Sequence, residues 1–324
     1  MRARFRLSRL GAPLLALALL LGCTRVESES VPPATENHLR VATWNIRFFP
    51  EPSTDTERTG QILAALDADL IAVQEIANSD SLGAMLEAVN TRLAQQARAS
   101  RLTNPRRYEH VLAESGGHGG QFVGYIFDRN AVSISDVETV TRLQMTPDLR
   151  PGLFARVTSL RGGVDFQVVV MHTDSGTKDR DYQNRLRFMD SLAVELSVRG
   201  EADRDIIVLG DLNTLGRLPD EDLPRVTAEE EIADLDAKAG EIGLRRLSNL
   251  PACTEYYRGS GSFLDHILVS RAMTEAPSNA VARGAGYCVV AGCQRLDPDD
   301  MPYDYEHVSD HCPVVIDVTD VDWD

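Results

Sequence analysis

The sequence has no apolar run long enough for an ordinary membrane-spanning helix, which needs about 20 apolar residues. Residues 14–21 are apolar, but this run is short and lies close to the N-terminus. A protein with several membrane spans is therefore excluded. Basic residues are also few, with 33 Lys and Arg against 49 Asp and Glu. The net charge of −16 argues against a protein that coats nucleic acid, because such binding depends on Lys and Arg.

Cysteine is scarce too, with five residues in 324, and no two have the Cys-x-x-Cys spacing of a zinc site. Four of them lie in the C-terminal third, and an even number in an exported chain suggests disulfides. Cys288 and Cys293 flank a short loop and could pair, which would leave Cys253 to pair with Cys312. The other connectivities and four free thiols remain alternatives.

The N-terminus has the pattern of an export signal. Four arginines precede the apolar residues 10–21, and no acidic residue occurs before Glu27, which predicts a signal peptide over residues 1–22. The string LLGC at residues 20–23 resembles a bacterial lipoprotein signal, in which the Cys carries the lipid. The alternative is a secreted protein in which Cys23 occurs by chance. Residues 23–37 are polar, include Pro32 and Pro33, and predict a flexible tether.

This pattern predicts a protein that is exported and lipid-anchored through Cys23 to the bacterial cell envelope, at the outer membrane or its periplasmic face, or else secreted. We expect a monomer.

The rest of the chain alternates apolar strands with amphipathic helices, without internal repeats, and predicts one α/β domain with mixed sheets over residues 38–319. Residues 320–324 form an acidic tail. The acid-rich residues 219–240 are interpreted as a solvated loop and helix face, because they lack the ligand spacing of a calcium site. The predicted helices cover residues 54–66, 82–97 and 180–198, and the predicted strands cover residues 39–44, 69–74, 121–127, 166–171, 205–209, 263–269 and 313–318.

Polar side chains recur at the ends of these apolar strands. One such residue is commonly a turn residue, but six occurrences are hard to explain as turns. Ligands bind at strand ends in α/β folds, so we expect these side chains to meet in one site. Carboxylate and amide oxygens suit Mg²⁺ or Mn²⁺, and histidines add proton transfer, which together favour hydrolysis at phosphorus. The strand-end groups are Trp44-Asn45, Gln74-Glu75, Met171-His172, Asp211-Leu212-Asn213, Asp265-His266 and Asp310-His311.

These groups resemble, in order, the motifs of the endonuclease/exonuclease/phosphatase superfamily, which includes deoxyribonuclease I, apurinic endonucleases, neutral sphingomyelinases and inositol-polyphosphate 5-phosphatases. The resemblance covers nearly the whole domain and implies a four-layer α/β sandwich, with two face-to-face mixed β-sheets flanked by helices. The motifs are TWN (43–45), QE (74–75), MH (171–172), GDLN (210–213), LDHILVS (264–270) and SDHCPVVID (309–317).

The resemblance implies a divalent cation, Mg²⁺ or Mn²⁺, at this site. Glu75 corresponds to the principal metal carboxylate, with Asn45 and Asp310 beside it. Asp211 corresponds to the residue that orients or deprotonates the attacking water. Asn213 corresponds to its partner at the substrate phosphate.

Two histidines and one arginine complete the implied site. His311 corresponds to the catalytic imidazole of the family, paired with Asp265. His172 corresponds to a second imidazole, which stabilises the phosphoryl oxygens or protonates the leaving group. Arg150 matches a position where the family often places a substrate-binding arginine.

The chain also departs from the deoxyribonuclease pattern. Residues 76–78 lack the arginine that such nucleases place against DNA, and Gln121 stands where they carry a Glu that pairs with the first histidine. His172 would then lack a carboxylate partner and be less readily protonated. Cations that could still bind a polyanion are Arg101, Arg106, Arg107, Lys178, Arg180, Arg185 and Arg187.

Three functions are therefore compared. The leading hypothesis is a metal-dependent phosphoesterase that acts on nucleic acid, as a surface or periplasmic endonuclease. The second is a phosphatase or sphingomyelinase-like phosphodiesterase acting on a small or lipid substrate. The third is a non-catalytic binding lipoprotein, which the retention of every metal and histidine position disfavours.

Overall fold

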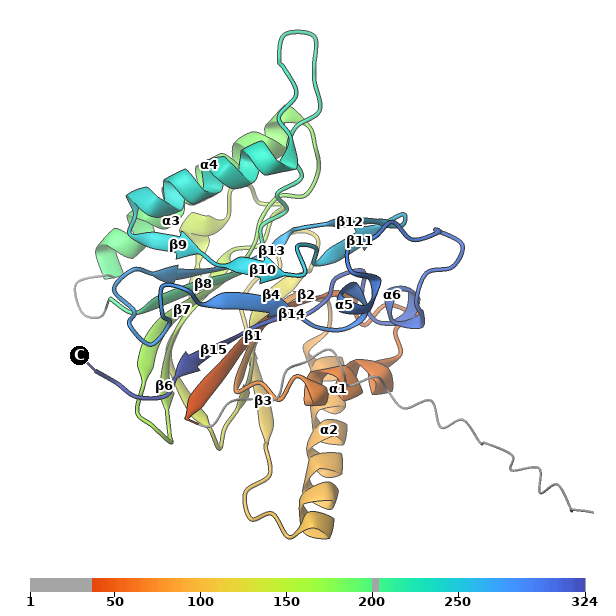
Figure 1. The fold of residues 1–324 in the computed structure, drawn as a ribbon, viewed down its shortest axis with the longest axis vertical. Helices are drawn as coiled ribbons and strands as arrows, with labels where there is room; N and C mark the ends of the chain where they lie inside the picture. Colours follow the sequence, from red (N-terminus) through yellow and green to blue (C-terminus); the bar gives the residue numbers. More distant parts are fainter. Residues whose placement is uncertain (1–36, 200–203, 324) are drawn as a thin grey trace, which may run out of the picture.

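The computed structural model describes residues 37–199 and 204–323, so the predictions for residues 1–36 lie outside the described part. Two mixed β-sheets face each other, and helices cover the outer side of each (Figure 1). This arrangement confirms the predicted four-layer α/β sandwich. None of the helices in the described residues has the length and apolar character needed to cross a membrane.

The first sheet has seven strands, in the order β10-β14-β15-β1-β2-β4-β3. Its central strand β1 runs parallel to β2 and antiparallel to β15, so the sheet is mixed. Tyr125, on β4, is fully buried, as its place in an alternating strand predicts. The strands are β1 His38–Phe49, β2 Leu70–Ile76, β3 Tyr108–Leu112, β4 Phe122–Asp128, β10 Ser248–Leu250, β14 Val281–Gly284 and β15 Val314–Thr319.

The second sheet has six strands, in the order β5-β6-β7-β8-β13-β9. Its register brings functional candidates together, because His172 on β7 pairs with Asp211 on β8, and Asp211 also pairs with Asp265 on β13. The strands are β5 Val132–Val140, β6 Gly152–Ser159, β7 Asp165–His172, β8 Ile206–Asp211, β9 Leu244–Arg246 and β13 Asp265–Ser270.

Three apolar layers hold the sandwich together. Between the sheets, side chains such as Val41, Val168 and Leu209 form the central core. Helices α1 and α2 pack on the outer face of the seven-stranded sheet, and α3 and α4 pack on the six-stranded sheet (Figure 1). The helices on these two outer faces are α1 Thr56–Ala65, α2 Ser79–Ser100, α3 Asp179–Arg199 and α4 Ala228–Glu241, and the 3-10 helix η2 Thr141–Leu143 lies between α2 and α3 in the chain.

A smaller cluster at one end of the sandwich contains both disulfides, Cys253–Cys293 and Cys288–Cys312. The prediction that Cys288 pairs with Cys293 is wrong. Cys288 lies within α5, whereas Cys293 follows the left-handed Gly292 that ends this helix, so the two side chains meet different segments. The cluster also holds β11 Glu255–Tyr257, β12 Ser260–Ser262, α5 Tyr287–Ala291 and α6 Tyr303–His307.

Candidate active site

Polar side chains from both sheets meet at one edge of the sandwich. Asn45, near the end of β1, connects them, because its amide Nδ2 donates to Glu75 Oε1 at 3.2 Å and to Asp211 Oδ2 at 3.0 Å. Glu75 lies on β2 of the first sheet, whereas Asp211 ends β8 of the second. The predicted meeting of strand-end residues therefore occurs across the interface between the sheets.

Glu75 is held in an unusual backbone conformation. Its φ is +61°, and Phe48, whose N–H donates to Glu75 Oε2 at 3.1 Å, has a φ of +46°. Left-handed backbone at non-glycine residues costs about 1–3 kcal/mol and is concentrated at functional sites. A register shift in β1 between Asn45 and Phe49 produces this geometry and directs a backbone N–H at the carboxylate.

His172 is buried between a cation and two carboxylates. Its Nε2 contacts the Arg150 guanidinium and lies 3.3 Å from Asp211 Oδ2 and 3.7 Å from Glu75 Oε1. Burial, together with the positive charges of Arg150 and His311, holds the pKa of His172 well below its usual range. A neutral His172 that accepts from Arg150 at Nε2 must carry its proton on Nδ1. Among the described residues, nothing accepts a hydrogen bond from that Nδ1.

Asp211 lies at the centre of the site and is almost fully buried. Its Oδ1 accepts from the backbone N–H of Asn213 at 2.9 Å, and its Oδ2 accepts from Asn45. Burial raises the pKa of Asp211 to about 7, opposed by the charge of His311 and reinforced by Asp265. Asn213 itself has a φ of +46° and donates from Nδ2 to the backbone oxygen of Thr173 at 3.3 Å.

His311 and Asp265 form the predicted pair. His311 Nδ1 lies 2.8 Å from Asp265 Oδ2, and His311 Nε2 lies 3.7 Å from Asp211 Oδ2. Burial acts to lower the pKa of His311, but the carboxylates of Asp265 and Asp211 outweigh it and raise this pKa well above its usual range. The imidazole is therefore held as a cation that directs Nε2 toward Asp211.

Asp310 lies at the same edge because its neighbours anchor it there. Ser309 Oγ donates to the backbone oxygen of Asn45 at 2.7 Å, and Tyr256 N–H donates to the backbone oxygen of Asp310 at 3.0 Å. The Asp310 carboxylate is half-buried and, in the part of the chain that the structure describes, has neither a hydrogen bond nor an ion pair. It is available for a ligand.

The carboxylates partly match the donor set of a magnesium site. No three His, Cys, Asp or Glu side chains among residues 37–199 and 204–323 converge on one point, but Mg²⁺ commonly binds through only one or two carboxylates and keeps its waters. Asp310 has no basic partner among the described residues, and Glu75 has only the 3.7 Å contact with His172, whose lowered pKa keeps it neutral, so these two carboxylates fit this mode. Asn45 fits less well, because its Oδ1 accepts from the backbone N–H of Arg47 at 3.1 Å. It positions Glu75 and Asp211 in this structure.

Glu255 is a site residue that the sequence did not reveal. It lies on the short hairpin β11–β12, forms a β-bridge with His311, and is 6% exposed. Burial raises the pKa of Glu255 to about 7, with His311 opposing and Asp310 adding to the shift. Its strand has only three residues, so no periodic pattern marks it.

The predicted basic residues do not form a rim around the site. Arg106 is paired with Asp67, Asp69 and Asp128. The neighbouring Arg107 directly precedes β3. The start of β3 pairs with the end of β4, and the end of β4 pairs with the start of β2. Arg107 therefore lies at the end of the sheet away from Glu75, which is near the end of β2.

The second basic group lies on α3 and just before it, nearer the site, and two of its four members are paired. Arg185 is buried against Glu231, and Arg180 pairs with Asp181. Lys178 and Arg187 remain exposed. Spacing along the sequence could not show these pairings, since most of the partners are far apart in the chain.

The disulfides hold the segment that carries His311, which gives a first prediction. Cys312 follows His311, and its N–H donates to the backbone oxygen of Thr254 at 2.7 Å, next to Cys253. Reduction of both bonds should lower the free energy of unfolding, by about 2–4 kcal/mol for each bond, as expected for loops of this length. Thermal denaturation with and without reductant measures this loss.

A variant with all four cysteines changed to Ala is the control for that experiment. It should melt at the temperature of the reduced protein and be insensitive to reductant. An unchanged melting temperature for the wild type in reductant would show that the disulfides do not stabilise the fold.

Comparisons with known proteins show the family of the chain. A model of the Endonuclease/Exonuclease/phosphatase family matches residues 42–311. A search of curated protein sequences finds no match.

Similar solved structures share the fold at low sequence identity. D. rerio TDP2 complexed with single-strand DNA product is 18% identical, with 87% of this chain and 99% of that chain covered and a TM-score of 0.52. An endonuclease/exonuclease/phosphatase from Bacteroides vulgatus is 15% identical, with 87% and 98% covered and a TM-score of 0.55. The mannosyl-6-phosphatase of Bacteroides thetaiotaomicron VPI-5482 is 16% identical, with 86% and 98% covered and a TM-score of 0.53.

Proposed function

The chain belongs to the endonuclease/exonuclease/phosphatase family of phosphoester hydrolases, and from this premise we propose that it hydrolyses phosphoesters with a divalent cation at the edge formed by Asn45, Glu75, His172, Asp211 and His311. The observation that carries the proposal is the position of Asp211. This buried carboxylate lies within 3.7 Å of both imidazoles and is hydrogen-bonded to the amide of Asn45.

Asp211 is placed to receive the proton of the attacking water. Burial raises its pKa to about 7, close to the value at which a general base works best near neutral pH. Two donors, the Asn213 N–H and the Asn45 amide, fix the orientation of this carboxylate. Asn213 Nδ2 donates to the backbone oxygen of Thr173, which holds the loop after β8 against the loop after β7.

Positive and hydrogen-bonding groups then stabilise the charge that develops on the phosphoryl oxygens. His311, held as a cation by Asp265, donates from Nε2. Arg150 supplies a second cationic donor beside His172, and the buried setting strengthens both interactions. His172 is neutral, which suits a hydrogen-bonding role better than that of a strong acid.

Glu75 and Asp310 would hold Mg²⁺ or Mn²⁺. Such an ion would supply Lewis-acid neutralisation of phosphoryl charge. The two groups that donate to Glu75, the Asn45 amide and the Phe48 N–H, are both neutral, so its charge is left to bind a cation.

We consider two substrate classes, each suggested by a protein that shares the fold. Nucleic acid is the first, since TDP2 is seen with single-strand DNA product, and a small phosphoester is the second, since a mannosyl-6-phosphatase shares the fold.

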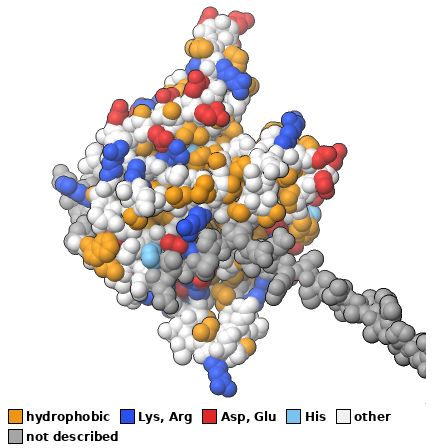
Figure 2. Space-filling view, in the orientation of Figure 1, with side chains coloured by type: hydrophobic (Ala, Val, Ile, Leu, Met, Phe, Trp, Pro, Cys, Tyr) orange, Lys and Arg blue, Asp and Glu red, His pale blue; other side chains and the backbone are white. Residues whose placement is uncertain are grey.

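Binding of a long polyanion depends on unpaired Lys and Arg, and Arg106 and Arg185 are already paired. On the face shown in Figure 2, basic and acidic side chains are scattered and form no continuous basic surface. We therefore favour a small phosphoester or a short single strand over a long duplex.

A substrate panel tests this preference. Purified protein with Mg²⁺ or Mn²⁺ should hydrolyse sugar phosphates, inositol phosphates or short oligonucleotides faster than long duplex DNA. Between 50 and 200 mM salt, KM for the best substrate should change by less than about tenfold, whereas six to ten phosphate contacts would change affinity by about 10³–10⁵. Preference for long DNA with a steep salt dependence would contradict this choice of substrate. Sphingomyelin vesicles complete the panel.

Location is tested through Cys23, which lies outside the described residues. We propose that lipid attachment at Cys23 anchors the exported chain to the cell envelope. Cys23→Ser should therefore appear in the soluble fraction or remain unprocessed, whereas Cys253→Ser, which removes a disulfide cysteine, should stay with the membrane. Membrane retention and normal processing of Cys23→Ser would rule out the lipoprotein assignment.

A further inference from the structure

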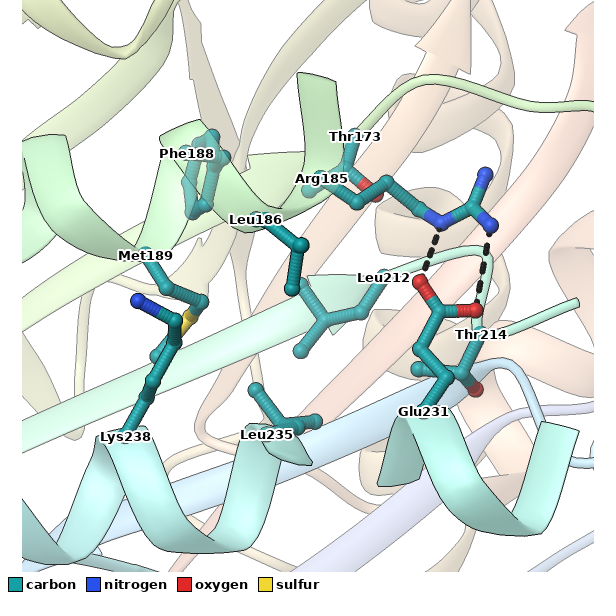
Figure 3. A pocket seen from close by; sticks show the side chains of 10 residues that line it. All are labelled: Thr173, Arg185, Leu186, Phe188, Met189, Leu212, Thr214, Glu231, Leu235 and Lys238. Carbon is teal, nitrogen blue, oxygen red and sulfur yellow. Dashed lines mark hydrogen bonds and ion pairs between the residues drawn. The ribbon is translucent and has the colours of Figure 1, made fainter. Parts of the chain in front are cut away.

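A buried ion pair contacts the loop that follows His172 (the His172 loop) and the loop that carries Asn213 (the Asn213 loop). Arg185 of α3 and Glu231 of α4 meet with Nε to Oε1 at 2.6 Å, and both side chains are 4% exposed (Figure 3). Glu231 thus departs from the solvated helix face expected for residues 219–240. A buried ion pair is costly to desolvate, and it stabilises a fold only when further hydrogen bonds satisfy its remaining atoms.

Arg185 binds backbone oxygens of both loops. Its Nη1 donates to the backbone oxygens of Asp174 at 3.1 Å and Gly176 at 2.9 Å, in the loop that follows His172. Its Nη2 donates to the backbone oxygen of Gly216 at 2.8 Å, in the loop that follows Asn213. One guanidinium therefore connects the chain segments leaving β7 and β8.

Glu231 completes the connection from the other side. Its Oε2 accepts from Arg185 Nη2 at 3.0 Å and from the backbone N–H of Gly216 at 2.7 Å. Gly216 has a φ of +75°, and an added Cβ would lie 2.3 Å from the backbone oxygen of Val226. The turn at Gly216 therefore brings the chain close enough for both charged side chains to bind its backbone.

The same two loops are joined directly beside the catalytic groups. The N–H of Thr173 donates to the backbone oxygen of Asp211 at 3.0 Å, and Asn213 Nδ2 donates to the backbone oxygen of Thr173. A displacement of either loop would therefore move His172 relative to Asp211.

Packing alone does not fix these loops. A cavity of about 20 Å³, room for about one water molecule, lies between α3, α4 and the loops, lined by Thr173, Leu212 and Thr214 among others (Figure 3). The hydroxyl of Thr173 is buried and, in the described part of the chain, lacks a hydrogen-bond partner. Hydrogen bonds to Arg185 and Glu231 therefore set the loop positions where side-chain packing is incomplete.

We propose that Arg185 and Glu231 are positioning residues for phosphoester hydrolysis, which hold the His172 loop and the Asn213 loop in catalytic register. This inference rests on the proposed function. Neither residue touches the reacting groups, so their effect must pass through the backbone of the two loops.

The test replaces both charges with apolar side chains of similar size, as Arg185→Met with Glu231→Leu. Removing one partner alone would leave a buried, uncompensated charge, whereas replacing both often leaves stability unchanged. The matched control is Arg40→Met with Asp317→Leu, which removes a largely buried pair between β1 and β15, away from the site. Each protein is measured for melting temperature, kcat, KM and amide hydrogen exchange.

We expect the Arg185/Glu231 variant to stay folded, to lose about 10–100-fold in kcat and to show a smaller change in KM. This loss in kcat is the scale expected when catalytic groups are slightly misplaced. Amide exchange should become faster in residues 173–178 and 214–218. The control should keep the wild-type kcat. Wild-type kcat and wild-type exchange in a folded Arg185/Glu231 variant would overturn the proposal.

Arg185→Lys decides the question if the double variant does not fold. Lysine keeps the charge but cannot reach Asp174, Gly176 and Gly216 with one planar group. A folded Arg185→Lys protein should lose kcat, and full kcat would overturn the proposal. If the wild type hydrolyses no phosphoester, the proposed function fails, whereas loop exchange in the variants still tests the positioning role.

Discussion

Replacement of His311 by Ala should lower kcat by about 10²–10⁴-fold, the usual cost of removing a positioned acid or base. The pKa of His311 is raised well above its usual range by Asp265 and Asp211, so at neutral pH the imidazolium can donate to a phosphoryl oxygen. Asp265→Asn should be nearly as damaging, because the amide cannot supply the negative charge that holds this cation. Steady-state kinetics on the best substrate measures both effects.

His266 provides the control for that experiment. It follows Asp265 on β13 but lies on the opposite face, where its Nε2 is 2.9 Å from Thr214 Oγ1. The Thr214 hydroxyl donates its one proton to the backbone oxygen of Phe263, so it must accept a hydrogen bond from His266. His266→Gln keeps an N–H donor at this position. His266→Gln should therefore retain most activity. An inactive His266→Gln beside an active His311→Ala would show that the site is wrongly assigned.

Replacement of Glu75 by Gln should reduce kcat/KM at fixed Mg²⁺ by about 10²–10³-fold, the scale of losing one electrostatic group in an active site. Glutamine has the same shape, and its one carbonyl oxygen can still accept from the Phe48 N–H, so the backbone around φ +61° is preserved. The charge that would attract the cation and the acceptor of the Asn45 amide are both lost. EDTA should abolish wild-type activity, and added Mg²⁺ or Mn²⁺ should restore it.

Metal binding can be measured independently of turnover. Mg²⁺ or Mn²⁺ should raise the melting temperature of the wild type, since a ligand that binds only the folded state stabilises it, and should do so less for Glu75→Gln. Glu109→Gln, a change to an exposed carboxylate on β3, should respond as the wild type does. Full activity of Glu75→Gln in EDTA would contradict the metal-dependent mechanism.

Local sequence patterns predicted most of the secondary structure. The helix expected over residues 82–97 is α2, Ser79–Ser100, and the strand expected over residues 166–171 is β7, Asp165–His172. Both have long apolar patterns of a single period. Strands β3, β5, β9 to β12 and β14 were missed. Strands β9 to β12 have three residues each, too few to display a period, and β5 is exposed along much of its length, so its apolar pattern is weak.

The sequence predicted which residues would meet at the site better than it predicted their environment. Strand-end placement brings His172, Asp211 and Asp265 together through strand register alone. The raised pKa of Asp211 and the neutral state of His172 depend on burial and on charges contributed by distant segments. Those quantities arise only when the two sheets close on each other.

Apolar period and strand ends are local properties, so the amino-acid sequence predicts the class of fold, the edge at which polar residues gather and the chemistry that those residue types permit. The disulfide pairing, the burial of Arg185 against Glu231 and the place of Glu255 beside His311 depend on how the folded layers pack. Each of these joins segments 24 or more residues apart. Which distant segments meet is set by the packing of whole layers, and the energy of a buried charge depends on the partners that this packing provides.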